Sequence, residues 1–376
     1  MLGVPTNVLE IVIYIAFIVW LVYRFRTKQK INLRLPLPVW AWVAVGLVAG
    51  AINPQILDGL GQWKALFFDP LLVYIMIINH PETSLKDVPR ALVVTGIPYG
   101  LFGLIGFWGY QVASDGRFMG IFGFEPSASA NFWALLISPL LVIAVWAVCE
   151  WQGRWRTIAF VSSMILLANA FGTGSRGVAI ALVGGIAFAW IWVNFHKTKK
   201  WVGALAALLV GLCLVTLIFA RPDLNASPTD GRVATSNNIR LYVWQTSIEM
   251  FKQKPILGVG LGNFQNTFKE LTKDRVNYPE YISPYALTAH NLYLQILVVM
   301  GVVGFLVFAW WLYTILRQLS RAEITHERVL IVAALGAVLA FGLVDTPYFK
   351  NDLAVIWWIL VAVLSSSVVY GKKESK

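Results

Sequence analysis

The uncharged stretch NLYLQILVVMGVVGFLVFAWWLYTIL at residues 291–316 decides the class of fold. It has 26 residues and no charged side chain, and a helix of roughly 20 apolar residues is long enough to cross a hydrocarbon core about 30 Å thick. Similar runs recur along the chain, which is 58% hydrophobic and 13% charged, whereas a soluble domain averages about 25% charged residues. The sequence therefore predicts an all-α, polytopic membrane protein.

Eleven apolar runs are expected to be membrane spans. We place them at residues 8–23, 37–53, 60–79, 91–113, 129–148, 157–171, 177–195, 201–220, 291–316, 329–344 and 353–370. Together they leave little room for a separate soluble domain, so we expect residues 1–376 to form a single integral membrane domain.

The basic residues predict the orientation of the spans. If the spans alternate, one set of loops, together with the carboxyl-terminal tail, holds 18 Lys and Arg, whereas the short loops of the other set hold only Arg117, Arg176 and Lys350. Cytoplasmic loops carry the excess of Lys and Arg. We therefore expect the amino terminus outside and the carboxyl terminus in the cytoplasm. The net charge of +11 then reflects topology, and nucleic acid is not an expected partner.

One external loop, residues 221–289, is 69 residues long, and loops above about 15 residues are usually functional or disordered. Between residues 238 and 253 apolar side chains recur at helical spacing. A second short helix is expected after Asn263, which is a good N-cap residue. The sequence GVGLG at residues 258–262 resembles a dinucleotide fingerprint only superficially, and we interpret it as a turn. The pattern predicts a large folded external loop.

Two cationic side chains near the external face are candidates for binding an anion. Arg176 lies in the turn GTGSRG, residues 172–177, which precedes a predicted span. Backbone N–H groups at a helix N-terminus and a guanidinium together favour a phosphate, although Arg176 could instead anchor a tight turn. Lys64 lies in the third span near its outer end. It could face a substrate there, or extend its amine to the membrane interface.

His290 is the one histidine that the predicted topology places outside, at the start of the ninth span. An imidazole can act as a general base at neutral pH. On an unbroken helix Gly301 and Gly304 lie below it on the same face, and small residues there let another helix or a lipid chain approach closely. The sequence has no Cys/His cluster with zinc spacing, no Walker loop and no Asp-x-Asp pair, so neither a metal ion nor another cofactor is expected.

Three features together resemble the bacterial O-antigen ligase family. They are the turn Ser175-Arg176-Gly177, the large outer loop with RLYVW at residues 240–244, and His290-Asn291 followed by nine residues and then GVVG at residues 301–304. The His-Asn and Gly-x-x-Gly pattern is fairly specific at the external start of a late span, whereas Ser-Arg-Gly alone is weak. The resemblance extends over most of the chain.

The resemblance implies a GT-C-like helical glycosyltransferase fold. Such a protein transfers a glycan from undecaprenyl diphosphate to an acceptor hydroxyl, on lipid A core or a similar acceptor, at the external face of the bacterial inner membrane. The reaction is inverting and metal-independent, and belongs to lipopolysaccharide biosynthesis in the cell envelope. Family members usually have twelve spans and a cytoplasmic amino terminus, so a twelfth span before residue 130 stays open.

The resemblance also implies a role for each candidate residue. His290 deprotonates the acceptor hydroxyl, and Arg176 and Arg240 hold the donor diphosphate, because arginines must supply the electrostatic stabilisation when no metal does. Lys64 and Arg117 are further candidates for the diphosphate site. The supporting residues are Asn291, Gly301, Gly304, Asp345 and Lys350.

Two alternatives remain open at this stage. A polymerase or a protein O-oligosaccharyltransferase on the same fold differs only in its acceptor. A flippase or transporter of lipid-linked glycans belongs to another class. It would more naturally contain internal repeats and a site at the membrane midplane, whereas the polar residues of this sequence gather at one face.

Overall fold

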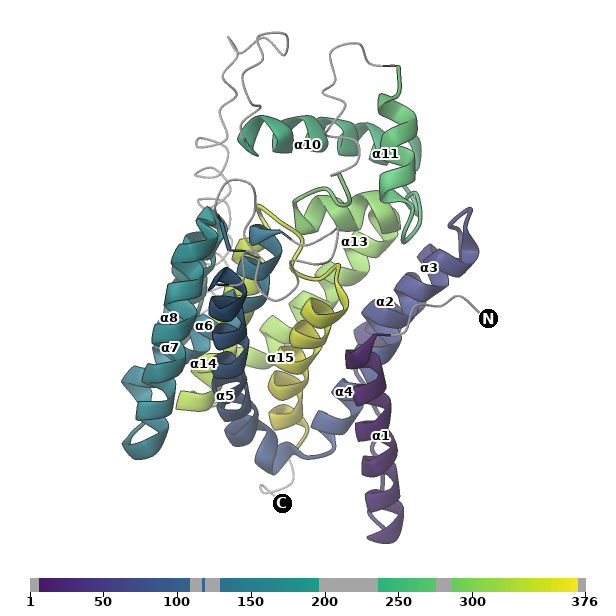
Figure 1. Cartoon of the computed structure of the whole chain (residues 1–376). Coiled ribbons are helices and arrows are strands. Elements are labelled where there is room, and N and C mark those ends of the chain that lie inside the picture. The colour runs from purple at the N-terminus through teal and green to yellow at the C-terminus, as the bar shows by residue number, and fades with distance from the viewer. Residues whose placement is uncertain (1–6, 109–116, 119–128, 196–235, 275–285, 371–376) are drawn as a thin grey trace. The chain divides into compact units, whose positions relative to one another are not determined.

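The computed structural model describes residues 7–108, 117–118, 129–195, 236–274 and 286–370. Every element described is a helix (Figure 1), and the expected all-α, polytopic class is confirmed. The elements are α1 (Val8–Arg26), α2 (Leu37–Ala51), α3 (Ile56–Trp63), the π-helix η1 (Lys64–Phe68), α4 (Asp69–Ile78), α5 (Pro81–Trp108), α6 (Ala130–Glu150), α7 (Gly153–Thr173), α8 (Arg176–Phe195), α10 (Ser236–Gln253), α11 (Phe264–Thr272), α13 (Leu292–Leu319), α14 (His326–Phe341) and α15 (Asn351–Tyr370).

Within the described residues, seven helices are long and apolar enough to cross a membrane. Three more of the expected spans fall on α2, α14 and α15, which are outside these seven. The expected span at residues 201–220, and the last residues of the one at 91–113, lie outside the described part of the chain. The apolar runs therefore located the helices well, and the span count and orientation stay predictions.

The chain divides into two compact units, and the expectation of one integral domain stays a prediction. Unit 1 comprises Met1–Val73, Cys213–Thr314 and Gly342–Val355. Unit 2 comprises Tyr74–Leu212, Ile315–Phe341 and Ile356–Lys376. Each unit is described by itself below.

The core of unit 2 is built on α6 and α14. Side chains from Val329 to Phe341 of α14 are buried all around the helix, as expected of a helix enclosed by others. Glycines let α8 approach α14 closely, because a Cβ at Gly185 would lie 3.1 Å from the Cβ of Ala337 and one at Gly336 would lie 2.5 Å from the Cβ of Phe188. This small-residue packing holds apolar helices together where water supplies no driving force.

A buried amide joins three helices of unit 2. Asn169 of α7 donates to the carbonyl of Gly100 on α5 at 2.9 Å and accepts from the indole N–H of Trp133 on α6 at 3.0 Å. Ser162 of α7 adds a hydrogen bond of 2.8 Å to the carbonyl of Val93 on α5. Polar side chains inside a bundle connect helices in this way because they find few other partners there.

In unit 1 a tyrosine compensates for a proline. Pro70 of α4 has no N–H, so the carbonyl of Leu66, four residues earlier, loses its helical donor. The hydroxyl of Tyr348 donates to this carbonyl at 2.8 Å and accepts from the indole N–H of Trp42 at 2.9 Å. The loop before α15 is thereby fixed against α2 and η1.

Helix α13 is broken at Gly301, where φ is 65° and ψ is −169°. The segment after α10 supplies hydrogen-bond partners at the break. Val259 and Gly260 donate their N–H groups to the carbonyls of Val298 and Val299 at 2.8 and 3.2 Å. In return, the N–H groups of Val302 and Val303 donate to the carbonyls of Pro255 and Ile256 at 2.8 and 3.3 Å. This segment is therefore a turn, as expected, but one that is hydrogen-bonded into a helix.

The break corrects the interpretation of Gly301 and Gly304. The helical-wheel argument assumed a continuous helix, whereas a Cβ at Gly301 would collide with the backbone of Ile256 and Leu257. A Cβ at Gly304 would collide with the side chain of Met300, which lies over it because of the break. The nearest neighbours at these two positions are thus the chain's own loop and helix.

The described part of the external loop contains both expected helices, α10 and α11. In Figure 1, α10 lies across the direction of α1, another helix of unit 1. Asn263 precedes α11 but its side chain makes no capping hydrogen bond to that helix. Its amide instead donates to the carbonyl of Val259 at 3.0 Å, so the expectation of an Asn263 side-chain cap is wrong.

Candidate functional site

His290 is held in an unusual backbone conformation just before α13. Its φ is 46°, a left-handed value that is uncommon for residues other than glycine and that clusters at functional sites. Two flanking contacts hold it there. The N–H of Ala289 donates to the Gln295 side chain at 2.7 Å, and the Asn291 side chain accepts from the N–H of Leu294 at 2.9 Å, capping α13. The imidazole is thus aimed by the helix start.

The loop between α14 and α15 is attached to the same helix start. The Asn291 amide donates to the carbonyl of Leu343 at 2.9 Å, and the N–H of Leu292 donates to the carbonyl of Gly342 at 2.7 Å. Asn291 therefore positions the loop that carries Asp345. This gives the predicted supporting residue Asn291 a specific structural role.

His290 and Asp345 form a pair. The imidazole Nδ1 lies 3.3 Å from Asp345 Oδ1, and the two side chains are 28% and 7% exposed. Burial alone would raise the pKa of Asp345, but the charges of His290 and Arg240 and the hydrogen bond from His290 outweigh it and lower that pKa. Asp345 therefore stays ionised at neutral pH, with His290 in contact with it and the charge of Arg240 acting on it.

The pair can perform general-base chemistry. A carboxylate accepts from the Nδ1–H of a neutral imidazole, so the lone pair lies on Nε2. The same arrangement orients the imidazole and stabilises the positive charge that forms on it when it takes a proton. The partly exposed imidazole leaves Nε2 a route to a substrate hydroxyl.

Lys64 belongs to a second charged cluster of unit 1. Its ammonium lies 2.5 Å from Glu10 Oε2 and 3.6 Å from Asp69 Oδ2. Tyr14 donates to Asp69 Oδ1 at 2.6 Å, and Asn351 donates to Glu10 Oε1 at 3.1 Å. Both carboxylates are 2% exposed and the lysine is 23% exposed. Lys64 is thus matched by two carboxylates of the protein itself.

The π-helix explains how Lys64 reaches Asp69. The N–H of Asp69 donates to the carbonyl of Lys64, five residues earlier. This wider turn brings residues five apart toward one side of the helix, whereas an α-helix places them well apart. Glu10 and Tyr14 were missed by the sequence analysis. The signal available was a lone acid in an apolar run, which needs a partner inside a membrane.

In unit 2, Arg117 lies beside the turn that leads to Arg176. Arg176 is the first residue of α8, and Gly174 before it ends α7 in a left-handed conformation with φ 56°. The N–H of Phe118 donates to the carbonyl of Gly172 at 2.9 Å, and a Cβ at Gly174 would lie 3.4 Å from Arg117 Cδ. Arg117 therefore lies against the turn that precedes Arg176 at the start of α8.

The remaining candidates are placed as follows. Lys350 directly precedes α15, and its carbonyl accepts from the N–H of Ala354 at 2.8 Å. Arg240 lies in the first turns of α10. Among the described residues, no three His, Cys, Asp or Glu side chains gather as a metal site requires.

Comparisons with known proteins agree with the motifs. The family model described as O-Antigen ligase matches residues 161–309, which include Arg176, Arg240 and His290. A protein of Rickettsia conorii named "Putative polysaccharide ligase" is 28% identical over 121 residues, or 32% of this chain and 28% of that protein. A protein of Rickettsia typhi with a similar name is 25% identical over 125 residues, covering 33% and 29% of the two chains.

The helices and these matches together define the class of protein. By its helices it is an all-α, polytopic membrane protein. The predicted resemblance to the O-antigen ligase family is confirmed by the match over residues 161–309. The 121 residues aligned with the Rickettsia conorii protein cover 28% of the length of that protein.

Proposed function

We propose that this protein transfers a glycan from undecaprenyl diphosphate to an acceptor hydroxyl at the external face of a bacterial inner membrane. The family match supports a polysaccharide ligase. The observation that carries the proposal is the His290–Asp345 pair with Arg240 nearby. The proposal includes the orientation that the basic residues predict, with the amino terminus outside and the carboxyl terminus in the cytoplasm.

In the proposed reaction His290 Nε2 takes the proton of the acceptor hydroxyl. The acceptor oxygen bonds to the anomeric carbon, the bond from that carbon to the diphosphate oxygen breaks, and undecaprenyl diphosphate leaves with the electron pair. Attack from the face opposite the leaving group inverts the anomeric centre. Asp345 stabilises the imidazolium that forms, in the way a buried carboxylate does beside a catalytic histidine.

Arginines supply the positive charge in this proposal. The charge of Arg240 acts on Asp345, while Arg117 lies against the turn that precedes Arg176 at the start of α8. Guanidinium groups bind phosphate oxygens bidentately, and charge placed where the leaving group develops its own charge is often the largest catalytic effect. Lys64 has a different position, since two carboxylates already match its charge, and we assign it no direct contact with the donor.

The test is conjugate formation by purified protein given undecaprenyl-diphosphate glycan and an acceptor lipid in the presence of EDTA. We expect His290→Ala and Arg176→Ala to abolish conjugate, a loss of about 10²–10⁴-fold for a general base. His326→Ala is the matched control, because His326 is 71% exposed and pairs with Glu150 at the surface; it should retain activity.

Two outcomes would count against the proposal. Normal turnover by His290→Ala protein would remove the general-base role. A requirement for magnesium would overturn the metal-free mechanism. Supplying a protein acceptor or a second donor glycan in place of the lipid separates ligation from protein glycosylation and from polymerisation.

A further inference from the structure

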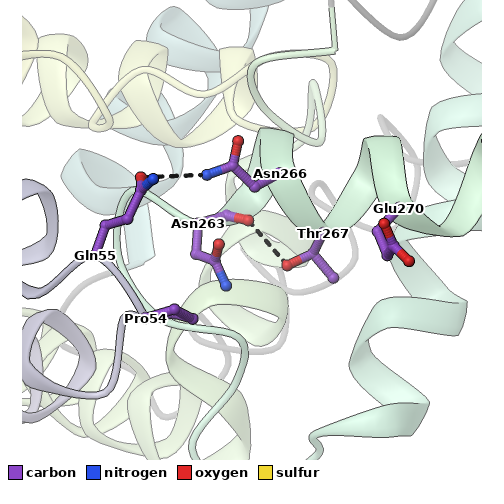
Figure 2. Close-up of a pocket in the computed structure, with 6 residues that line it drawn as sticks. All are labelled: Pro54, Gln55, Asn263, Asn266, Thr267 and Glu270. Atoms are coloured by element: carbon purple, nitrogen blue, oxygen red, sulfur yellow. Dashed lines mark hydrogen bonds between the residues drawn. The ribbon is translucent and has the colours of Figure 1, made fainter.

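A shallow pocket of unit 1 is lined by none of the candidate site residues discussed above. Its volume is about 430 Å³, and it is lined by Pro54, Gln55, Asn263, Asn266, Thr267 and Glu270 (Figure 2). One wall is the connection between α2 and α3, and the other is the start of α11. These walls are more than 200 residues apart in the chain, since Gln55 and Asn266 are separated by 211 positions.

Hydrogen bonds beneath the pocket hold its two walls in place. Asn53 donates to the carbonyl of Leu261 at 2.5 Å and accepts from the N–H of Gln55 at 2.9 Å. The N–H of Leu261 donates to the carbonyl of Ala49 at 2.9 Å. At Gly262, where φ is 79°, a Cβ would lie 3.0 Å from Asn53 Nδ2. The pocket is therefore formed before any ligand binds, which lowers the entropic cost of binding.

The pocket is also tied to the helix that follows His290. The segment entering the pocket wall, residues 258–261, is the one whose N–H groups complete the break in α13. A ligand held against α11 is thus bound by the same unit that carries His290 and Asp345. In the predicted topology, the end of α2 and the start of α13 both lie at the external face.

The exposed surface of the pocket is mostly apolar, and its polar groups suit a ligand with hydroxyl groups. Three of the six residues are carboxamides, one is a hydroxyl and one is a carboxylate. Each carboxamide offers two N–H donors and a carbonyl acceptor. Figure 2 shows the Gln55 and Asn266 amides pointing toward each other, with Asn266 Nδ2 at 3.5 Å from Gln55 Oε1, which is a long hydrogen bond. A sugar hydroxyl both donates and accepts, so it can bond to both amides.

The same lining argues against an anion or a metal ion. The six residues include no Lys or Arg, although the chain has 30 such residues, and phosphate sites are built from these side chains. One carboxylate, Glu270, is few for Ca²⁺, which usually takes several, and its Oε1 is already 2.5 Å from the ammonium of Lys273.

We propose that this pocket binds a neutral sugar unit of the glycan, through hydrogen bonds from Gln55 and Asn266. The assignment of that sugar to a substrate rests on the proposed function, since either the donor glycan or a glycan acceptor could supply it. The pocket holds the glycan against α11, while His290 of the same unit acts on the acceptor hydroxyl.

The test measures sugar binding without turnover. Saturation-transfer NMR on the detergent-solubilised full chain uses methyl glucoside, methyl galactoside and N-acetylglucosamine as probes. We expect signal from at least one sugar and about tenfold weaker binding by the Gln55→Ala/Asn266→Ala variant, which removes two hydrogen-bonding side chains. Both residues are exposed, so the variant should fold. Lys269→Ala, on an exposed position of α11 outside the lining, is the control and should bind normally.

Several outcomes would contradict the proposal that this pocket binds a sugar. These are no signal from any of the three sugars, equal signal from the double variant, competition by inorganic phosphate, or loss of binding in EDTA that calcium restores. In the conjugation assay, a raised KM for the donor or for the acceptor, with kcat unchanged, supports the pocket and identifies the source of the sugar. A fall in kcat with both KM values unchanged would contradict it. Sugar binding that depends on Gln55 and Asn266 in a protein that forms no conjugate would refute the proposed function and leave the pocket standing.

Discussion

The His290–Asp345 pair and the Lys64 cluster both belong to unit 1, and in each a basic side chain is held beside buried carboxylates. Lys64 is matched by two carboxylates, each 2% exposed, inside a predicted span. His290 has one carboxylate partner, at the end of a helix, and its side chain is 28% exposed. We call the Lys64 cluster closed because two carboxylates flank its ammonium, which is 23% exposed, and the His290–Asp345 pair open because one carboxylate contacts one imidazole nitrogen.

The difference teaches where chemistry can occur in such a fold. A charge in the membrane interior is tolerated when the protein supplies oppositely charged partners. We expect a lysine flanked by two carboxylates to be held by them and not to bind a substrate. A catalytic group needs one partner to orient it and one open side. By this criterion we expect the Lys64 cluster to have a structural role and the His290–Asp345 pair to be the one that reacts, as in the proposed function.

The largest effect should follow from removing the cation of the closed cluster. Lys64→Met leaves Glu10 and Asp69 without their charged partner, and breaking a buried pair in this way costs about 3–5 kcal/mol. Adding Glu10→Gln and Asp69→Asn should recover most of the loss. Unfolding in detergent measures both. A triple variant no more stable than Lys64→Met would show that the three charges do not act as one cluster.

Removing the charge of the open pair should affect activity more than stability. Asp345→Asn keeps the side-chain size but no longer stabilises the imidazolium, so we expect kcat to fall by about 10²-fold or more with little change in KM. Conjugate formation as a function of pH is the measurement. An unchanged kcat and an unchanged pH profile would place Asp345 outside the mechanism.

Disturbing the helix beneath the pair should have a smaller effect. Gly301→Ala places a side chain at a φ of 65° against the backbone of Ile256, a strain of about 1–3 kcal/mol. Gly61→Ala is the matched control, because a Cβ there meets nothing within 4 Å. Thermal unfolding of both variants gives the comparison. Equal melting temperatures would mean that the break in α13 has no need of glycine.

The smallest effect is a dependence of stability on acid. The pKa of Asp345 is lower in the folded protein than its ordinary value, so the unfolded chain takes up the proton first as pH falls. The stability from ionised Asp345 is then complete above about pH 4, the ordinary range for Asp, and is lost as pH falls through the lowered value. The stability difference between wild type and Asp345→Asn should narrow in that window. A difference constant from pH 7 to pH 3 would contradict this.

Much of the fold followed from local sequence. A helix satisfies its own backbone hydrogen bonds, so an apolar run of sufficient length predicts a helix without knowledge of its neighbours. This is why the run at residues 129–148 corresponds to α6 and the turn before Arg176 separates α7 from α8. The His-Asn and Ser-Arg-Gly motifs are likewise local, and they indicated the family.

Only the tertiary structure decided which of these residues meet. Asp345 is 55 positions from His290, and Glu10 is 54 from Lys64, and no periodicity in the sequence connects such pairs. The break at Gly301 was also out of reach, because a helical wheel assumes regular hydrogen bonds while the donors that complete this helix lie in the segment after α10. The sequence by itself determined the helices and the local motifs that indicated the family. Packing between distant segments decided that Lys64 meets two carboxylates and that His290 meets one and is 28% exposed.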